Sequence, residues 1–419
     1  MAKKITIEQI NIEAPYELPE GWKWCRLGDV CESSKEKTEI FSQETKYVGL
    51  EHIDSNGKIN GYGSAIEIKS LKNVFHKNQI LYGKLRPYLN KHDIANFDGV
   101  CSTDILVFNA KNNFSNRYIN YFFNLPCFID FVVSNSKGIN LPRVSEKTVL
   151  DIPFPLPPTL AEQERIVNRI ETMFAKLDQA QEKAQAVLDS FETRKAAILH
   201  KAFSGQLTAN WRKEKGVPDD SWEEMRLGDC GTIYGGGTPS MSHKEYWDNG
   251  NILWITSKDM KSDVINDSEM HVNMKGVENS SAKYIDRPAV LFVMRSGILR
   301  RTFPVCMVNK EFTVNQDLKA LVPKTSILLE YLFYACKANE RKILDTCMKS
   351  GTTVESINSE SLFNFVMNIP SHPEQQEIVR ILDTVLEKES RAKEAAQTVL
   401  DQIALLKKSI LARAFRGEL

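Results

Sequence analysis

The chain has 419 residues, of which 42% are hydrophobic, and its 54 lysines and arginines balance 54 aspartates and glutamates. At roughly 150 residues per domain this length predicts two or three domains, and the hydrophobic fraction excludes a disordered chain. A net charge of zero argues against a simple polybasic nucleic-acid binder. Because no apolar run approaches the ~20 residues of a membrane span and residues 1–19 lack the apolar stretch of a signal peptide, we expect a cytoplasmic protein.

The sequence contains an internal duplication. Three pairs of segments share one offset, which is 212 residues for Glu162 and Glu374 (374 − 162). The pairs are Glu162-Gln163-Glu164-Arg165-Ile166-Val167 with Glu374-Gln375-Gln376-Glu377-Ile378-Val379, Val187-Leu188-Asp189 with Val399-Leu400-Asp401, and Ala202-Phe203-Ser204-Gly205-Gln206-Leu207 with Ala414-Phe415-Arg416-Gly417-Glu418-Leu419. A leader, Arg26-Leu27-Gly28-Asp29, also recurs as Arg226-Leu227-Gly228-Asp229.

The repeat divides the chain into four parts. We expect a first domain over residues 1–157, a central helix over 158–207, a second domain over 208–370 and a C-terminal helix over 371–419. The flanks and helices kept their sequence, whereas the two domains diverged. The predicted fold is α+β, with two α/β domains separated by a long antiparallel two-helix coiled coil in a pseudo-twofold tandem repeat.

In the first domain, residues 79–82 and 105–108 are expected to be strands and residues 117–124 a helix. The ten residues 82–91 combine cations, aromatic rings and an amide, and a Gly-containing loop follows at 136–138. Arginine can bridge guanine edges, asparagine can read adenine and lysine serves phosphate. The candidate DNA contacts of this domain are Tyr82, Lys84, Arg86, Tyr88, Asn90, Lys91, Lys137, Asn140 and Arg143.

The central helix is expected to run from Thr159 to about Phe203, because Pro157 and Pro158 precede it and Gly205 follows it. Its apolar residues step by four and three, which is the 3.5-residue repeat of a coiled coil. The C-terminal helix, from about Glu374 to Phe415, has the same pattern, with Glu389 as a charged interruption. The expected seam consists of Ile166, Ile170, Met173, Leu177, Val187, Phe191 and Ile198 with Ile378, Leu382, Val385, Val399, Ile403, Leu406 and Ile410.

The second domain is expected to contain strands at 252–255 and 289–293 and a helix at 328–338. A glycine-rich loop, residues 235–240, and a second loop, residues 349–353, offer polar side chains, and three arginines follow a strand. The candidate DNA contacts here are Thr238, Ser240, Arg295, Arg300, Arg301, Lys349, Thr352 and Thr353. Asp104 and Asp317 recur in both halves, where a structural cap or turn is favoured over catalysis.

The motifs of nucleotide-dependent and methyl-transferring enzymes are missing from the sequence. It has no Gly-x-x-x-x-Gly-Lys-Ser/Thr loop, no Gly-x-Gly-x-x-Gly fingerprint and no Asn-Pro-Pro-Tyr/Phe run. The eight cysteines form no Cys-x-x-Cys pair and the histidines no metal-binding pair, so we expect neither a metal site nor a disulfide framework. Glu44-Thr45-Lys46 fits half of a nuclease metal site, but the pattern has almost no specificity.

These features together resemble the specificity subunit of Type I restriction–modification enzymes, and the resemblance covers the whole chain. Its most specific parts are the tandem layout and the two helices with Glu-Gln-x-x-Ile-Val entries and Ala-Phe-x-Gly-x-Leu exits. The Arg-Leu-Gly-Asp leaders and Gly235 to Ser240 are also similar to this family. The first domain has Glu32-Ser33-Ser34-Lys35 in place of the Gly-Thr-Pro run.

The resemblance implies a DNA-binding scaffold without catalytic residues of its own. Each target-recognition domain would read one half of a split, asymmetric site in double-stranded DNA. The helices would set the spacer and dock two methyltransferase subunits, to which restriction subunits can add. S-adenosylmethionine would bind the methyltransferase partner, and this chain would hold no cofactor. Two alternatives stay open, a stand-alone nuclease or methyltransferase with an unrecognised site and a coiled-coil adaptor with no DNA role.

Overall fold

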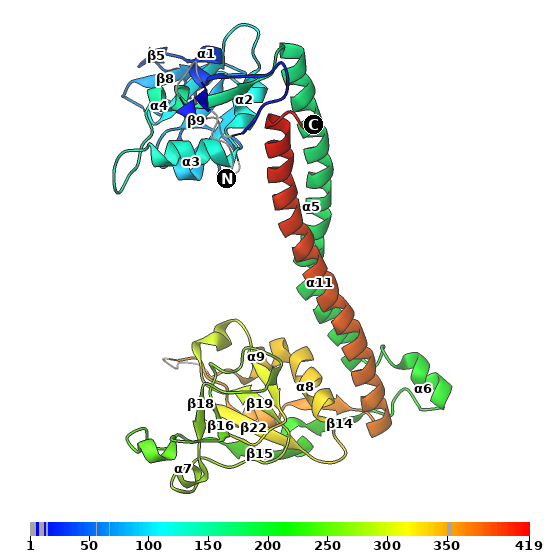
Figure 1. Ribbon diagram of the computed structural model, residues 1–419. Coiled ribbons are helices and arrows are strands. Elements are labelled where there is room, and N and C mark those ends of the chain that lie inside the picture. Colours follow the sequence, from blue (N-terminus) through cyan, green and yellow to red (C-terminus); the bar gives the residue numbers. More distant parts are fainter. Residues whose placement is uncertain (1–5, 8–11, 14–15, 56, 67, 350–353) are drawn as a thin grey trace. The chain divides into compact units, whose positions relative to one another are not determined.

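A computed structural model describes residues 6–7, 12–13, 16–55, 57–66, 68–349 and 354–419 (Figure 1). The chain forms two compact units, one made of residues 1–185 with 396–419 and the other of residues 186–395. Each unit joins one β-rich domain to parts of two long helices, α5 (Leu160–Phe203) and α11 (His372–Phe415). The expected α+β fold with two long helices is confirmed.

The first domain is built on a four-stranded sheet, β10-β9-β12-β4, and a five-stranded sheet, β5-β8-β11-β6-β7. The strands are β4 (Cys31–Ser33), β5 (Lys37–Thr38), β6 (Lys46–Val48), β7 (Gly63–Ser64), β8 (Lys72–Phe75), β9 (Ile80–Gly83), β10 (His92–Ile94), β11 (Gly99–Cys101) and β12 (Ile105–Ala110). Along β9, Ile80 and Tyr82 enter the larger core with Phe122, while Leu81 enters a smaller core with Val48. Successive strand residues point to opposite sides, so the two faces of β9 contact the two cores and both are buried.

Short elements complete the first domain. β3 (Lys23–Arg26) pairs with β13 (Pro153–Leu156), directly before α5, and β1 (Thr6–Ile7) pairs with β2 (Ile12–Glu13). The helices are α1 (Leu27–Val30), α2 (Asn116–Phe122), α3 (Pro126–Ser134) and α4 (Glu146–Leu150), with 3-10 turns η1 (Leu50–His52) and η2 (Pro87–Leu89). β9, β12 and α2 lie within two residues of the predicted strands and helix.

The second domain repeats this plan with five strands in one sheet and three in the other. Its sheets have the orders β15-β22-β19-β20-β17 and β18-β16-β21, and β14 pairs with β23 directly before α11. The strands are β14 (Glu223–Arg226), β15 (Gly231–Gly235), β16 (Ile252–Ile255), β17 (Val264–Ile265), β18 (Met270–Val272), β19 (Ala289–Val293), β20 (Val305–Val308), β21 (Phe312–Val314), β22 (Leu318–Pro323) and β23 (Val366–Ile369). The helices and 3-10 turns are α6 (Ala209–Lys215), η3 (Leu227–Cys230), η4 (Lys244–Tyr246), α7 (Met274–Glu278), η5 (Gly297–Arg300), α8 (Leu329–Ala338), α9 (Glu340–Cys347) and α10 (Ser359–Phe363).

The duplication extends to individual contacts between each domain and a helix end. In the first unit, the Tyr118 ring on α2 stacks 4.6 Å from the ring of Phe415, and its hydroxyl donates to the Pro155 carbonyl at 3.2 Å. In the second unit, the ring of Tyr331 on α8 lies 5.3 Å from that of Phe203, and its hydroxyl donates to the Asn368 carbonyl at 2.8 Å. The Ala-Phe exits of both helices therefore serve as anchors for a domain.

Both long helices end at glycine, as predicted for Gly205. Gly205 has φ of +76° and Gly417 has φ of +74°, the left-handed conformation that follows many helix C-termini. At the start of α5, the Thr159 hydroxyl accepts from the backbone N–H of Glu162 at 3.1 Å and caps the first turn. The repeated Ala-Phe-x-Gly motif therefore encodes an anchor followed by a stop.

The two long helices pack against each other in an antiparallel orientation (Figure 1). In the first unit, Lys407 near the end of α11 donates to Asp178 in the first half of α5. In the second unit, Arg194 Nε near the end of α5 donates to Glu389 Oε2 in the first half of α11 at 2.8 Å. The charged interruption of the expected seam is thus matched by an arginine of the other helix.

The buried stripe along α11 differs in part from the expected seam. Val399 and Leu406 of the expected seam are 38% and 49% exposed, whereas Ile403 is buried as expected, and so is Leu411, which lies outside the expected seam. A step from 403 to 411 is eight residues, one more than a heptad. An α-helix has 3.6 residues per turn, so its buried stripe drifts away from a strict 3.5-residue pattern. Of the expected seam, Ile166, Ile170, Ile378, Leu382 and Ile403 are fully buried, and Met173, Leu177, Val187, Phe191, Ile198, Val385 and Ile410 are partly buried.

Candidate nucleic-acid interface

Two segments of the first domain that are distant in sequence are joined by backbone hydrogen bonds. Residues 84–91 and 137–144, here called the first loop pair, contain all the candidate contacts of this domain except Tyr82. Lys137 and Arg143 exchange two N–H to carbonyl bonds of 2.8 Å, and the N–H of Arg86 donates to the Pro142 carbonyl at 2.7 Å. The N–H of Val144 donates to the Lys84 carbonyl at 3.0 Å, so the segments form one rigid unit.

The turn η2 presents side chains to solvent from a constrained backbone. Arg86 and Asn90 flank it with φ of +52° and +44°, in the left-handed region that costs non-glycine residues free energy. The Asn90 side chain fixes one end by donating from Nδ2 to the Phe123 carbonyl at 2.9 Å. As a result Arg86 is exposed and Tyr88 keeps 54% of its surface accessible.

The cations of the first loop pair fall into two groups, those that have a partner within the chain and those that have none. Arg143 forks over the Asp104 carboxylate, with Nε 3.1 Å from Oδ1 and Nη2 3.4 Å from Oδ2, and these hydrogen bonds raise the pKa of Arg143. Lys84 Nζ lies 4.0 Å from Asp104, and Lys91 donates to the Leu50 carbonyl at 2.7 Å. Within the described part of the chain, Arg86 and Lys137 have no side-chain partner and remain available to a ligand.

Two of the candidate contacts in the first domain are corrected by the structure. Tyr82 is 0% exposed, and its ring lies 5.3 and 5.6 Å from those of Phe123 and Phe128, because its position on β9 points into the larger core. This burial raises the pKa of Tyr82. Asn90 is 9% exposed and supports the turn from inside. Lys137, Asn140 and Arg143 are exposed, as expected for contact residues.

The second domain contains an equivalent unit, here called the second loop pair, formed by residues 294–301 with 348–349 and 354–357. The N–H of Ile357 donates to the Met294 carbonyl, and the N–H of Lys349 donates to that of Ser356, both at 2.8 Å. The turn η5 stands where η2 stands in the first domain and carries Ile298, which is 43% exposed. The sequence did not predict that the two domains would share this arrangement.

The arginines of the second loop pair are likewise divided into paired and unpaired side chains. Arg295 donates from Nε to Asp317 Oδ1 at 2.7 Å, and Arg300 pairs with Glu355, whose pKa is lowered by that hydrogen bond. Arg301 and Lys349 are exposed and have no side-chain partner among the residues that the structure describes. Thr352 and Thr353, the other expected contacts of this loop, lie outside the described residues.

The glycine-rich loop after β15 lies beside the second loop pair. Thr238 donates to the side chain of Gln316 at 2.6 Å, next to the Asp317 that receives Arg295. A Cβ added to Gly236 would stand 2.0 Å from the Asn315 carbonyl, so only glycine allows this close approach. Ser240, which is also exposed, contacts Ser242 instead, at 2.8 Å between hydroxyl oxygens.

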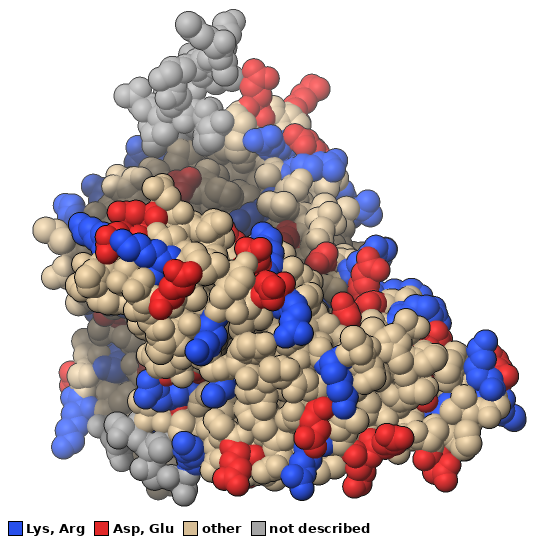
Figure 2. Space-filling model, turned by 90° about the horizontal axis from the view of Figure 1, so that it is seen from below, with Lys and Arg blue, Asp and Glu red and all other residues tan. Residues whose placement is uncertain are grey.

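The surface charge is mixed in sign. Figure 2 shows lysine and arginine side chains interspersed with aspartate and glutamate over the face in view. This agrees with the balanced totals of the sequence. Any attraction to a polyanion must therefore come from local cations such as Arg86 and Lys137, because the net field of the protein is weak.

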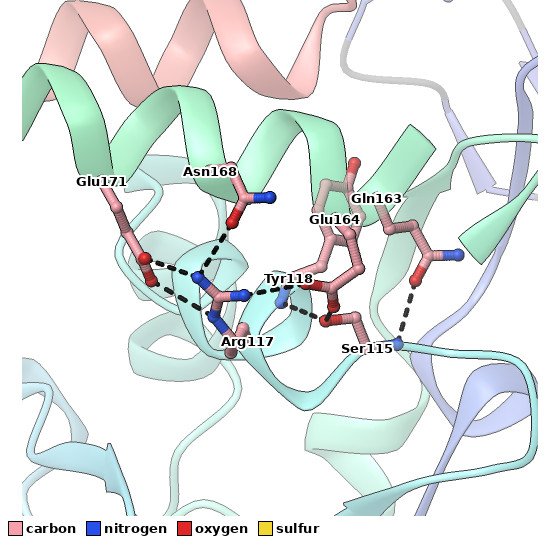
Figure 3. Close-up of polar contacts among 7 residues, drawn as sticks. All are labelled: Ser115, Arg117, Tyr118, Gln163, Glu164, Asn168 and Glu171. Atoms are coloured by element: carbon pink, nitrogen blue, oxygen red, sulfur yellow. Dashed lines mark hydrogen bonds and ion pairs between the residues drawn. The ribbon is translucent and has the colours of Figure 1, made fainter. Parts of the chain in front are cut away.

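The first domain is fastened to α5 by a polar cluster that the sequence analysis did not predict (Figure 3). Gln163 Oε1 accepts from the backbone N–H of Ser115 at 3.0 Å, just before α2. Arg117 on α2 donates to Glu164 at 2.8 Å and also pairs with Glu171, which raises the pKa of Arg117. The repeated Glu-Gln motif is therefore structural, and the recurrence of Gln163 as Gln375 was its sequence signature.

Gln375 performs the same task in the second unit. Its Oε1 accepts from the N–H of Leu328 at 2.9 Å, just before α8, and its Nε2 donates to the carbonyls of Ser326 and Pro370. The neighbouring Glu374 is 0% exposed and accepts from Arg212 Nη1 and from the Thr208 hydroxyl, each at 2.6 Å. This buried ion pair joins the segment around α6 to the start of α11.

The described residues contain neither a metal-binding cluster nor a helix suited to a membrane. In that part of the chain, no three His, Cys, Asp or Glu side chains are grouped so as to hold a metal ion. Lys46 of the Glu44-Thr45-Lys46 pattern places its Nζ 4.7 Å from the ring centres of both Tyr62 and Phe97. Within the described residues, none of the helices has the length and apolar content needed to cross a membrane.

Comparison with known sequences gives a family. The chain is 32% identical over 272 residues to the specificity subunit of the Type I restriction enzyme EcoR124I/EcoR124II of Escherichia coli, covering 64% of this chain and 62% of that one. It is 35% identical over 217 residues to the EcoDI specificity subunit of Escherichia coli, covering 51% and 48%. The alignments thus span about half to three fifths of these relatives.

The fold is also found in solved structures. The HsdS subunit from Thermoanaerobacter tengcongensis matches with a TM-score of 0.68 and 22% identity, covering 97% of this chain and 99% of that one. A chain from a study of complex assembly and conformational transition of the type I R-M system matches with a TM-score of 0.75 and 23% identity, covering 97% and 100%. The family model described as Type I restriction modification DNA specificity domain matches residues 19–188 and again 219–399. The chain therefore belongs to the specificity subunits of Type I restriction–modification systems and carries the DNA specificity domain twice.

Proposed function

We propose that this chain selects the DNA sequence on which a Type I restriction–modification complex acts. Each domain, taken as residues 1–157 and 208–370, reads one half of a bipartite, asymmetric site in double-stranded DNA through its loop pair. The observation that carries this proposal is the repeated loop pair with different side chains. Arg86 and Tyr88 of the first turn correspond in position to Ile298 and its neighbours in the second, so equal scaffolds present unequal surfaces.

The helices, residues 158–207 and 371–419, are proposed to set the spacer and to dock two methyltransferase subunits. The methyltransferase would bind S-adenosylmethionine, restriction subunits could join the complex, and the complex would act in the cytoplasm. Relatives that are specificity subunits of Type I restriction enzymes, and a similar chain from a study of assembly of the type I R-M system, support this division of labour. No residue of this chain is assigned a catalytic role.

Substitution of one free arginine in each loop pair tests the proposal. Arg86→Ala should relax the first half-site, and Arg301→Ala should relax the second. A lost base contact of this kind costs about 1–3 kcal/mol of discrimination. Sequencing of methylated sites in cells that carry each variant with its partners gives both half-sites at once, so each variant is the control for the other.

Other outcomes of this experiment, and of assays on the purified chain, would change the conclusion. If Arg86→Ala lowered modification at all sequences equally, Arg86 would contact phosphate. If neither variant altered the motif, the loop pairs would not be the reading surface. Purified chain that transferred methyl groups or cut DNA without partners would support the alternative of a stand-alone enzyme. A chain whose presence never changed DNA binding or methylation would support the coiled-coil adaptor.

The spacer role has a separate test. Insertion of seven residues into each long helix, after Gln185 and after Ala395, adds about 10 Å of helix at ~1.5 Å per residue. That equals about three base pairs of duplex at ~3.4 Å each. The preferred spacer should lengthen accordingly, and an unchanged methylated motif would show that the helices do not set the spacing.

A further inference from the structure

The loop 138–142 of the first loop pair carries aliphatic side chains that the domain itself does not use. Ile139 is 101% exposed and Leu141 is 45% exposed. A single exposed apolar residue needs no explanation, but these two lie within one five-residue loop. Together they form what we call the apolar tip.

The backbone fixes the apolar tip, although its side chains pack on nothing in the described domain. The paired bonds of 2.8 Å between Lys137 and Arg143 close the loop at its base. Gly138 has φ of +105°, and a Cβ at this position would lie 3.0 Å from the Leu141 carbonyl, so the turn is tight. Such a loop holds Ile139 in a defined position without any contribution from core packing.

Polar groups suited to a nucleic acid surround the apolar tip. Lys137 and Asn140 are exposed on either side of Ile139. The bond from the Arg86 N–H to the Pro142 carbonyl at 2.7 Å links the same loop to the turn that carries Arg86 and Tyr88. A membrane or a hydrophobic protein groove does not require the unpaired cations Arg86 and Lys137 and the Asn140 amide in the same loop pair as the aliphatic residues. DNA, by contrast, offers phosphates, base edges and methyl groups together.

The second domain keeps an aliphatic residue at the corresponding position. Arg143 forms a β-bridge with Leu85 as Ser356 does with Arg295, so Leu141 and Val354 both stand two residues before this bridge. Val354 is 46% exposed. An exposed aliphatic side chain at this position therefore occurs in both loop pairs.

We infer that the apolar tip of the first domain, Ile139 with Leu141, contacts the C5-methyl group of a thymine in the major groove and so determines one position of the first half-site. The inference rests on the proposed function. In the major groove the methyl group distinguishes thymine from the other bases, and an aliphatic side chain is the partner it accepts. Transfer of one methyl-sized group out of water changes affinity roughly fourfold.

Deoxyuridine, which is thymidine without that methyl group, gives a direct test. Bound duplexes are selected from a random library made with thymidine and from one made with deoxyuridine, using the full chain with its modification subunit. Wild-type protein should prefer a thymine at one position of the first half-site and lose about fourfold of that preference with deoxyuridine. Ile139→Ala should show the reduced preference on both libraries, while the second half-site stays unchanged.

A matched control and a thermodynamic cycle sharpen the experiment. Ile40→Ala removes the same atoms from a side chain that is 88% exposed elsewhere in the first domain, and should leave the motif unaltered. Affinities of wild type and Ile139→Ala for single duplexes with thymine or uracil at the identified position should show coupling of about fourfold. Additive effects would overturn the inference.

Failure of the inference and failure of the proposed function give different results. Selection of no bipartite motif by any protein would contradict the proposed function. A clear motif that deoxyuridine and Ile139→Ala leave unchanged would remove the apolar tip from base recognition alone. An unchanged motif together with weaker binding of the modification subunit by Ile139→Ala would assign the tip to a protein contact and equally overturn the inference.

Discussion

Arg143 holds Asp104 with two nearly parallel hydrogen bonds, of 3.1 Å from Nε and 3.4 Å from Nη2. In the second domain Asp317 stands at the same point of the fold, yet it receives Arg295, which comes from the other segment of its loop pair. The aspartates were kept through the duplication and the arginines changed sides. Each aspartate thus serves as a fixed acceptor that orients whichever cation its domain supplies.

We expect Asp104→Asn to change DNA recognition without unfolding the first domain. The pair is exposed, with side-chain accessibilities of 46% and 28%, and exposed pairs contribute little to stability. Release of Arg143 should lower affinity for the first half-site about tenfold, because the orientation of the loop pair is lost. Anisotropy with duplexes that vary one half-site at a time measures this, and Asp317→Asn should affect only the second half-site. A large shift of the urea midpoint would instead identify Asp104 as a folding residue.

Gln163 and Gln375 should be more important for stability than for recognition. Gln163→Leu leaves the buried N–H of Ser115 without an acceptor, which costs about 1–3 kcal/mol. Gln375→Leu should cost more, because three hydrogen bonds of that side chain are lost. Urea unfolding of the full chain is the measurement, with Gln179→Leu at an exposed position of the same helix as control. Equal stability of Gln163→Leu and Gln179→Leu would contradict the assigned role.

The roles of Gln163 and Gln375 were not predicted from the sequence, although several strands and both long helices were. Strands such as β16 (Ile252–Ile255) and β19 (Ala289–Val293) were predicted to the residue, because both are short apolar runs rich in β-branched and aromatic residues. The helices followed from their repeat and from the stop at Gly205. The placement of Tyr82 was wrong, since a period of two does not reveal that both faces of β9 are covered. The loop pairs and the Arg212 to Glu374 contact could not be predicted, because they join segments that are close only after folding.

The buried pair of Arg212 and Glu374 should be sensitive to loss of one partner. Arg212→Met leaves the Glu374 carboxylate, which is 0% exposed, without its cation. Removal of one member of a buried pair costs about 3–5 kcal/mol, whereas replacement of both by apolar residues can be nearly neutral. The double variant Arg212→Met with Glu374→Met should therefore be more stable than Arg212→Met alone in urea unfolding. Strictly additive losses would show that the two residues act independently.

His92 should make the first domain sensitive to acid. It lies on β10 with 1% exposure, Nδ1 is 2.8 Å from Asn120 Oδ1, and burial lowers the pKa of His92 to about 4. In the unfolded chain the pKa of histidine is about 6.5. Between pH 6.5 and 4, His92 therefore binds a proton in the unfolded state but stays neutral in the native state. The stabilisation is therefore complete above about pH 6.5 and is lost as the pH falls, by about 2 kcal/mol at pH 5.

His92→Gln removes this titration and keeps a polar side chain on β10. The variant is expected to be less stable than wild type at pH 7, and the difference between them should shrink by about 2 kcal/mol at pH 5. Hydrogen exchange of peptides that cover β9 and β10 reports the local free energy of opening in the full chain. His76→Gln serves as the control, because His76 is exposed beside Glu36 and Asp98 and is not buried in the core. If wild type and His92→Gln lost protection in parallel on acidification, protonation of His92 would not be the cause of acid sensitivity in this domain.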